Sequence, residues 1–141
     1  MQYNNKSALA TPLANKVVLL NKQLAFYGAQ CPHGKKRKNA DGTIRMSVDI
    51  KRGYLYPLLE KGNTLFVYAL RQLKGKDYVR RSQELIEEIQ AQCYLIMQMR
   101  GWNERTCAEL DLLCDDIAKQ IYAITAHNAR AATPTGESGS V

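Results

Sequence analysis

Apolar residues recur at alternating steps of three and four positions in four stretches of this chain. Such spacing places side chains on one face of an α-helix, and a helix with one apolar face has to bury that face against other elements. The first helix is expected from Thr11 to about Gln30, where Thr11 suits the N-cap and Pro12 suits the first helical position. Its apolar stripe consists of Leu13, Val17, Leu20, Leu24, Tyr27 and Cys31. Pro32 and Gly34 then end the helix.

Three further helices are expected from about Tyr54 to Lys74, from Asp77 to about Arg100 and from Asn103 to about His127. Their stripes contain Leu55, Leu58, Gly62, Leu65 and Ala69, then Ser82, Ile86, Ile89, Cys93 and Ile96, then Cys107, Leu110, Cys114, Ile117, Ile121 and Ile124. Asp77 and Asn103 suit N-caps, and Gly101 suits the C′ position after the third helix. Gly62 indicates a close helix approach or a local kink. The pattern predicts an all-α fold, an antiparallel up-down four-helix bundle.

The length of 141 residues suits a single domain. The expected organisation is a flexible N-terminus over 1–10, the bundle over 11–127, and a disordered tail of small and polar residues over 128–141. No apolar run approaches the roughly 20 residues that a membrane span needs. The first residues also lack the apolar core of a signal peptide. These observations predict a cytoplasmic protein without a membrane partner.

The link between the first two helices, residues 32–53, has a different pattern. Residues 43–50 alternate polar and apolar side chains, which is the period of a β-strand. The preceding sequence NADGT indicates a turn, so the basic run 35–38 can supply the other arm of a β-hairpin. Two strands alone are only marginally stable. The link is therefore expected to be a basic β-hairpin insertion, with a flexible solvated loop as the alternative.

Positive charge is concentrated in the first part of the chain. The whole chain has a net charge of +7. Residues 1–82 hold 16 Lys and Arg against 4 Asp and Glu, a net of +12, whereas residues 83–141 hold 4 against 9, a net of −5. Clustered Lys and Arg attract phosphates and release their counterions. The basic part therefore predicts a polyanion partner, and the acidic part can face a basic segment of a second copy or of another protein.

Two groups of basic residues are the candidates for nucleic-acid binding. They are Lys35, Lys36, Arg37, Lys38, Arg45, Lys51 and Arg52 in the insertion, and Arg71, Lys74, Lys76, Arg80 and Arg81 around the link between the second and third helices. Tyr54, Tyr56 and Tyr78 lie among them and can stack on bases. The alternatives are lysines that only keep the surface soluble, and a nuclear-import signal.

A zinc site and an enzymatic site both lack the necessary residues. Cys31 and His33 form one imperfect ligand pair without a second pair, and the other three cysteines lie in core stripes, where free thiols behave as small apolar side chains. The only other histidine is His127, and no nucleotide-binding, hydrolase or metalloprotease motif is present. The carboxylates Glu84, Glu87, Glu88, Asp111, Asp115 and Asp116 are interpreted as a solvated face or a docking surface. We therefore expect no catalytic residues, metal or cofactor, and a protein that is not an enzyme.

The segment RRSQELIEEIQAQCYLIMQMRGWNERTCAELDLLCDDIAKQIYAI, residues 80–124, resembles the last two helices of a known four-helix-bundle family. That family includes ribosomal intervening-sequence proteins and the accessory variability determinants (Avd) of diversity-generating retroelements. The resemblance rests on the helix QELIEEIQAQ, the turn Gly101-Trp102 and the helix LDLLCDDIAKQIYAI. The long basic insertion departs from the family pattern.

The resemblance implies a non-enzymatic function. Proteins of the Avd type are homopentamers that bind nucleic acid and a reverse transcriptase and support cDNA synthesis from a template RNA. By analogy, the basic residues of this chain would bind RNA or an RNA/DNA hybrid, and a neighbouring surface would hold the polymerase. The alternative is a helical protein-interaction adaptor that does not bind nucleic acid.

Overall fold

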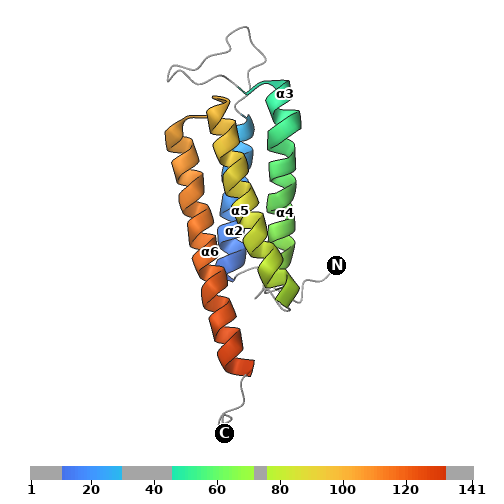
Figure 1. The fold of residues 1–141 in the computed structure, drawn as a ribbon, viewed down its shortest axis with the longest axis vertical. Helices are drawn as coiled ribbons and strands as arrows, with labels where there is room; N and C mark the ends of the chain where they lie inside the picture. The colour runs from blue at the N-terminus through green and yellow to red at the C-terminus, as the bar shows by residue number, and fades with distance from the viewer. Residues whose placement is uncertain (1–10, 30–45, 72–75, 133–141) are drawn as a thin grey trace.

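The computed structural model describes residues 11–29, 46–71 and 76–132, and these ranges are helical throughout apart from short connections. The elements are α2 (Pro12–Ala29), α3 (Val48–Ile50), the π-helical turn η1 (Lys51–Leu55), α4 (Tyr56–Leu70), α5 (Lys76–Gln98) and α6 (Glu104–Ala132). The described ranges contain no strand, so the all-α prediction is confirmed. Figure 1 shows the four long helices side by side along the long axis of the molecule.

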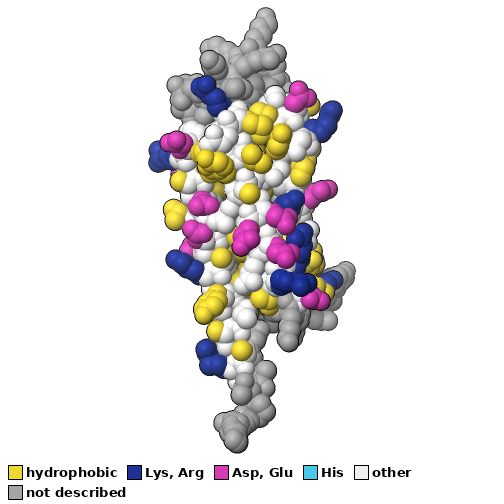
Figure 2. Space-filling model, viewed as in Figure 1, with side chains coloured by type: hydrophobic (Ala, Val, Ile, Leu, Met, Phe, Trp, Pro, Cys, Tyr) yellow, Lys and Arg dark blue, Asp and Glu magenta, His cyan; other side chains and the backbone are white. Residues whose placement is uncertain are grey.

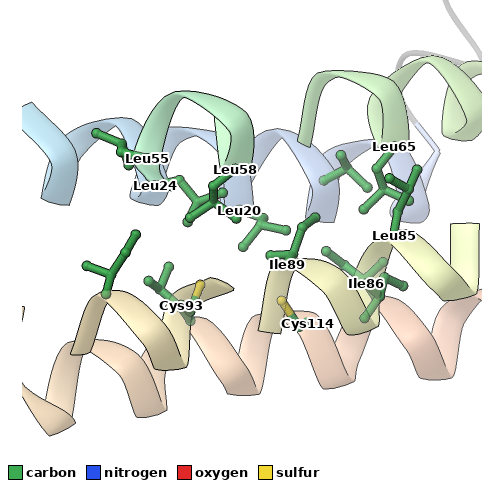
Figure 3. Packing of buried hydrophobic residues seen from close by; sticks show 14 of the residues in the cluster. Leu20, Leu24, Leu55, Leu58, Leu65, Leu85, Ile86, Ile89, Cys93 and Cys114 are labelled. Carbon is green, nitrogen blue, oxygen red and sulfur yellow. The ribbon is translucent and has the colours of Figure 1, made fainter. Parts of the chain in front are cut away.

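The core lies along the line where the four long helices meet. Helix α2 packs against α4 and α6, and α5 also packs against α4 and α6. The buried side chains include Leu20 and Leu24 of α2, Leu58 and Leu65 of α4, Ile89 and Cys93 of α5, and Leu110, Cys114 and Ile117 of α6. Figure 3 shows side chains of this cluster, among them Leu24, Leu58 and Ile89, pointing toward one another from neighbouring helices. The predicted stripes are therefore the faces that the helices bury.

The starts of α2 and α6 follow from two side-chain caps. The Thr11 hydroxyl accepts a hydrogen bond from the backbone N–H of Ala14 at 3.2 Å, and Pro12 occupies the first helical position. The Asn103 side-chain oxygen accepts one from the backbone N–H of Thr106 at 2.8 Å. Each cap satisfies a donor that the first helical turn leaves without a partner. Both predicted N-caps are thus confirmed.

The end of α5 differs from the prediction by one residue. Arg100, and not Gly101, has the left-handed backbone conformation, with φ of 64°. The backbone N–H of Gly101 donates to the carbonyl of Ile96, and that of Arg100 donates to the carbonyl of Met97, which is the Schellman pattern with Arg100 at C′. A Cβ on Gly101 would lie 2.9 Å from Cγ2 of Ile96, so glycine is needed there for close packing and not for its φ.

Two glycines mark the places where α2 approaches the second helical segment. A Cβ on Gly62 would lie 2.0 Å from Oδ1 of Asn21, and Nδ2 of Asn21 donates to the Gly62 carbonyl at 3.1 Å. A Cβ on Gly28 would lie 2.4 Å from Cδ2 of Leu55. The close approach predicted at Gly62 is confirmed, and Gly28 provides a second one.

The described end of the insertion is helical and not a strand. Val48–Ile50 begins a helix that continues without a break through η1 into α4, and residues 46–47 are not in a strand, so the strand predicted over 43–50 is wrong at residues 46–50. Ser47 explains the difference, because its hydroxyl accepts a hydrogen bond from the backbone N–H of Ile50 at 3.2 Å and caps the new helix. Residues 30–45, which contain the rest of the predicted hairpin, lie outside the described residues.

Two other boundaries differ. Asp77 lies in the first turn of α5, which begins at Lys76, so it is not the N-cap. Helix α6 continues to Ala132, so residues 128–132 are helical where a disordered tail was predicted. The predicted flexible N-terminus, residues 1–10, and residues 133–141 lie outside the described residues.

Candidate nucleic-acid interface

The two predicted basic groups lie at opposite ends of one continuous helical segment. Arg52 belongs to η1, near the start of this segment, and Arg71 directly follows α4 at its end. At a rise of 1.5 Å per residue, the backbones of Arg52 and Arg71 are about 28 Å apart along this segment. The structure therefore does not bring the two groups together. The other predicted residues Lys35, Lys36, Arg37, Lys38, Arg45 and Lys74 lie outside the described residues, and Lys76 is described only as the first residue of α5.

Two cations of the second basic group, Arg80 and Arg81 of α5, are paired with neighbouring carboxylates. A guanidinium nitrogen of Arg80 lies 3.3 Å from the Asp77 carboxylate. One of Arg81 lies 3.1 Å from both Glu84 and Glu88, and these two carboxylates raise the pKa of Arg81. Surface pairs of this kind add little stability. They nevertheless place acidic groups beside the cations that were predicted to bind phosphates.

Tyr78 in the same region is also engaged. Arg71 donates a hydrogen bond to its hydroxyl, and the guanidinium carbon lies 5.3 Å from the centre of its ring. Tyr68 packs against Tyr78 with ring centres 4.9 Å apart. Because Arg71 and Tyr68 already contact Tyr78, its ring is less suited to stacking on a base than the sequence suggested.

The basic group in η1 has different surroundings. Neither Lys51 nor Arg52 forms an ion pair with a described residue. The side chain of Arg52 is exposed, and Tyr56, four residues further along, is 52% exposed. The backbone N–H of Tyr56 bonds to the carbonyl of Lys51, one residue further back than in an α-helix. π-Turns of this kind occur frequently at functional sites.

A side chain of α5 is hydrogen-bonded to the π-turn η1. Nε2 of Gln92 donates to the backbone carbonyl of Tyr54 at 3.3 Å. Leu55 at the end of the turn is only 3% exposed and belongs to the core cluster. The inner side of η1 is therefore held by the bundle, whereas Arg52 and Gly53 on its outer side are exposed.

Most of the net positive charge of the chain belongs to residues outside the described ranges. The described ranges contain thirteen of the 20 Lys and Arg and eleven of the 13 Asp and Glu, a net of +2 out of +7. The largest share of the remainder belongs to residues 30–45, which directly precede the described stretch that leads into α3 and η1. The end of the bundle that carries Lys51 and Arg52 is thus the end next to the most basic segment.

A carboxylate face covers the middle of α5 and α6. Figure 2 shows Asp and Glu side chains gathered there, with hydrophobic side chains above and below them. Nε2 of Gln90 donates to Asp111 at 2.9 Å and to Asp115 at 3.0 Å, and neither carboxylate forms an ion pair with a described residue. Tyr94 on α5 is 55% exposed and Tyr122 on α6 is 73% exposed. Of the other acidic residues predicted here, Glu84 and Glu88 pair with Arg81, and Asp116 lies 3.8 Å from Lys16.

Two of the three cysteines in the described ranges belong to the core. Cys93 and Cys114 are buried, and burial raises the pKa of both, that of Cys114 to about 12. Cys107 is partly buried, and burial also raises its pKa. Among the described residues, no group of three or more His, Cys, Asp and Glu side chains is arranged to hold a metal ion. The imperfect zinc-ligand pair that the sequence offers, Cys31 and His33, lies outside those residues.

Sequence reasoning missed three exposed aromatic residues: Tyr94 on α5, Tyr122 on α6, and Phe26, which is 59% exposed on α2. Its position carried a signal, because Phe26 is not part of the stripe formed by Leu20, Leu24 and Tyr27. A large aromatic side chain off the buried face of an amphipathic helix is expected to be exposed.

Comparison with protein-family models, with curated proteins and with solved structures finds no match to this chain. Within the described residues, no helix is both long enough and apolar enough to cross a membrane.

Proposed function

We propose that this protein binds nucleic acid, with RNA as the principal ligand, at the end of the bundle formed by α3 and η1. The observation that carries the proposal is the contrast between the two basic groups. Lys51 and Arg52 have no described acidic partner and lie beside the exposed Tyr56, whereas Arg80 and Arg81 are each paired with carboxylates. The basic residues 35–38 and 45 precede this same end in the sequence.

Binding at this end is mainly electrostatic. The cations displace counterions from the phosphates, so the logarithm of the association constant falls linearly with the logarithm of the salt concentration. The contacts are directed at the backbone of the nucleic acid, and sequence selectivity is weak.

The role in which we place this binding activity follows from the family resemblance of residues 80–124. In this role the chain is a non-enzymatic accessory protein of a retroelement. It forms a homo-oligomer of antiparallel up-down four-helix bundles, a pentamer by analogy with the family, and it scaffolds a reverse transcriptase together with a template RNA or an RNA/DNA hybrid.

A pair of double variants tests the binding site. Fluorescence anisotropy with a labelled structured RNA is measured for Lys51→Ala/Arg52→Ala and for the matched control Arg80→Ala/Arg81→Ala. We expect the first variant to bind at least tenfold more weakly and to lower the salt slope by between one and two, because each lost phosphate contact removes about 0.7–0.9 from it. The control is expected to change affinity less than twofold. Equal losses in both variants would contradict the assignment of the site to η1.

The second candidate function is a protein-interaction adaptor, and the carboxylate face of α5 and α6 favours it. Asp111 and Asp115 have no described cationic partner, and the exposed Tyr94 and Tyr122 flank them along the helices. Such a face complements a basic protein surface. A gel-shift experiment at moderate salt separates the two candidates, because an adaptor without nucleic-acid binding leaves the RNA unshifted.

A further inference from the structure

Two contacts fix how α2 and α6 lie against each other along one outer side of the bundle. Near the start of α2, the Lys16 ammonium lies 3.8 Å from the Asp116 carboxylate. Near the end of α2, the Tyr27 hydroxyl donates a hydrogen bond to Glu109. Because the residue numbers rise along α2 and fall along α6 between these contacts, the two helices are antiparallel and the stretches between the contacts lie side by side.

On α6, an exposed leucine lies between the two contact residues. Leu112 is three residues after Glu109 and four residues before Asp116, and these spacings place the three side chains on one side of the helix. Leu112 is 67% exposed. Lys119, seven residues further along, points in nearly the same direction from the helix axis. It is exposed and forms no ion pair with a described residue.

Helix α2 presents the same combination of apolar and basic side chains. Leu19 is three residues after Lys16 and Phe26 is seven residues after Leu19, so both point away from α2 on the side of the contacts with α6. They are 43% and 59% exposed, and the ring of Phe26 packs edge-on against Tyr27 with centres 5.4 Å apart. Lys22 lies between them in the sequence, is exposed and forms no ion pair with a described residue. The α2/α6 face therefore consists of Leu19, Lys22, Phe26, Leu112 and Lys119.

The charges of the α2/α6 face are complementary to those of the carboxylate face of α5 and α6 (Figure 2). Lys22 and Lys119 are cations without a described ion pair, and Asp111 and Asp115 are anions without one. Either face placed against the same face of another copy would oppose like charges. The α2/α6 face placed against a carboxylate face instead pairs opposite charges and covers exposed apolar and tyrosine side chains together.

We propose that the α2/α6 face of one copy binds the carboxylate face of a second copy. This inference rests on the homo-oligomer of the proposed function and assigns the surfaces that form its interface. The aliphatic side chains of Leu19 and Leu112 suit contact with a protein surface, where interface cores are apolar. Because the two faces are different surfaces of one chain, the interface is heterologous, and each added copy leaves a face free until the assembly closes into a ring.

Sedimentation velocity without RNA tests the interface through charge reversal. The variants Lys22→Glu/Lys119→Glu and Asp111→Lys/Asp115→Lys should each associate about tenfold or more weakly than the unchanged protein, because each places like charges across the contact. An equimolar mixture of the two variants should associate again, because the reversed face of each is complementary to the reversed face of the other. All four positions are exposed, and circular dichroism checks that each variant is helical.

A pair of truncation variants tests the apolar part of the same interface. Phe26→Ala/Leu112→Ala should also weaken association by about tenfold or more, because large side chains buried at an interface contribute this much. The matched control is Val67→Ala/Leu95→Ala, which removes apolar side chains of similar exposure from α4 and α5. Leu95 is three residues after Gln92, on the side of α5 that faces η1, so the control should leave association unchanged.

Three results would overturn the inference, and they can be told apart. Unchanged association in all of the charge-reversal and truncation variants would show that the copies meet through other surfaces. Weakening in only one charge-reversal variant, or a mixture that does not recover, would show that the two faces do not contact each other. If the unchanged protein is monomeric, the homo-oligomer fails and the inference fails with it, whereas RNA binding at η1 is measured separately by fluorescence anisotropy.

Discussion

Replacing Gly28 by alanine should destabilise the protein although alanine is the better helix former. In an exposed helix interior, this replacement stabilises by up to about 1 kcal/mol. At Gly28, however, the new Cβ would lie 2.4 Å from Cδ2, 3.0 Å from Cδ1 and 3.2 Å from Cγ of Leu55. Leu55 is only 3% exposed and belongs to the core cluster, so its side chain can move away from the new Cβ only by displacing other core side chains.

The magnitude follows from the competition between these two effects. Overpacking of a filled core costs about 1–3 kcal/mol, and contacts with three atoms of one buried side chain place Gly28→Ala in the upper part of that range. After subtraction of the gain in helix propensity, we expect a net loss of about 1–2 kcal/mol in the free energy of unfolding. In the background of Leu55→Ala the clash is absent, and Gly28→Ala should instead stabilise by about 1 kcal/mol. The coupling energy of the two positions is then about 2–3 kcal/mol.

The assay is urea unfolding followed by far-ultraviolet circular dichroism and analysed by linear extrapolation. Gly53 supplies the matched control, because a Cβ there would meet nothing within 4 Å and the residue is exposed in η1. Gly53→Ala should therefore stabilise by about 0.5–1 kcal/mol. Two results would refute a clash between residue 28 and Leu55. One is a Gly28→Ala variant as stable as the unchanged protein. The other is a Gly28→Ala substitution that changes the free energy of unfolding by the same amount in the presence of Leu55 and in the Leu55→Ala background.

Two other measurements follow from the described contacts. Arg100→Gly should raise the free energy of unfolding by about 0.5–1 kcal/mol, because the left-handed C′ position strains every residue except glycine; a loss of stability in urea unfolding would show that contacts of the Arg100 side chain outweigh the strain. Cys93 and Cys114 remain protonated in the folded state, whereas their unfolded pKa is near the ordinary 9.0. Their contribution to stability is thus complete below pH 9 and is lost as the pH rises toward the folded pKa of about 12 for Cys114. Between pH 9 and 11, the free energy of unfolding should fall by about 1.4 kcal/mol per pH unit for each thiol. The variant Cys93→Ala/Cys114→Ala should lack this part of the pH dependence. Parallel pH profiles for the variant and the unchanged protein would contradict this expectation.

The sequence predicted the helical faces well because burial follows a simple period. Leu13, Val17, Leu20 and Leu24 are all buried, as are Leu110, Cys114, Ile117 and Ile121. The helix N-caps could also be predicted from the sequence, since Thr11 and Asn103 each bond to a backbone N–H only three residues further along the chain. These features depend on contacts close in sequence or on one face of one helix.

The remaining features depend on contacts between segments that are distant in sequence. The pattern of residues 43–50 fitted a strand, but the cap at Ser47 starts a helix that buries Leu55 against Gly28 of α2. One ion pair is also of this kind, because Lys61 and Glu88 belong to α4 and α5. The pairs of Arg80 and Arg81, in contrast, lie within α5. Asp77 and Glu84 are three residues from their partners, so the spacing of charges along the helix could have indicated these pairs from the sequence.

The π-turn at Lys51–Leu55 has a consequence for how such a chain can change. Because each residue of an α-helix turns the chain by about 100°, a π-turn is equivalent to one residue added to a regular helix. Deleting the exposed Gly53 would convert the turn to regular α-helix and rotate α3 relative to α4. The residues of α4 would keep their register, while α3 would face another side of the bundle. A one-residue insertion or deletion at this position would thus change the direction of α3 without shifting α4, and Met46, which precedes the turn and is buried in the core, would have to repack.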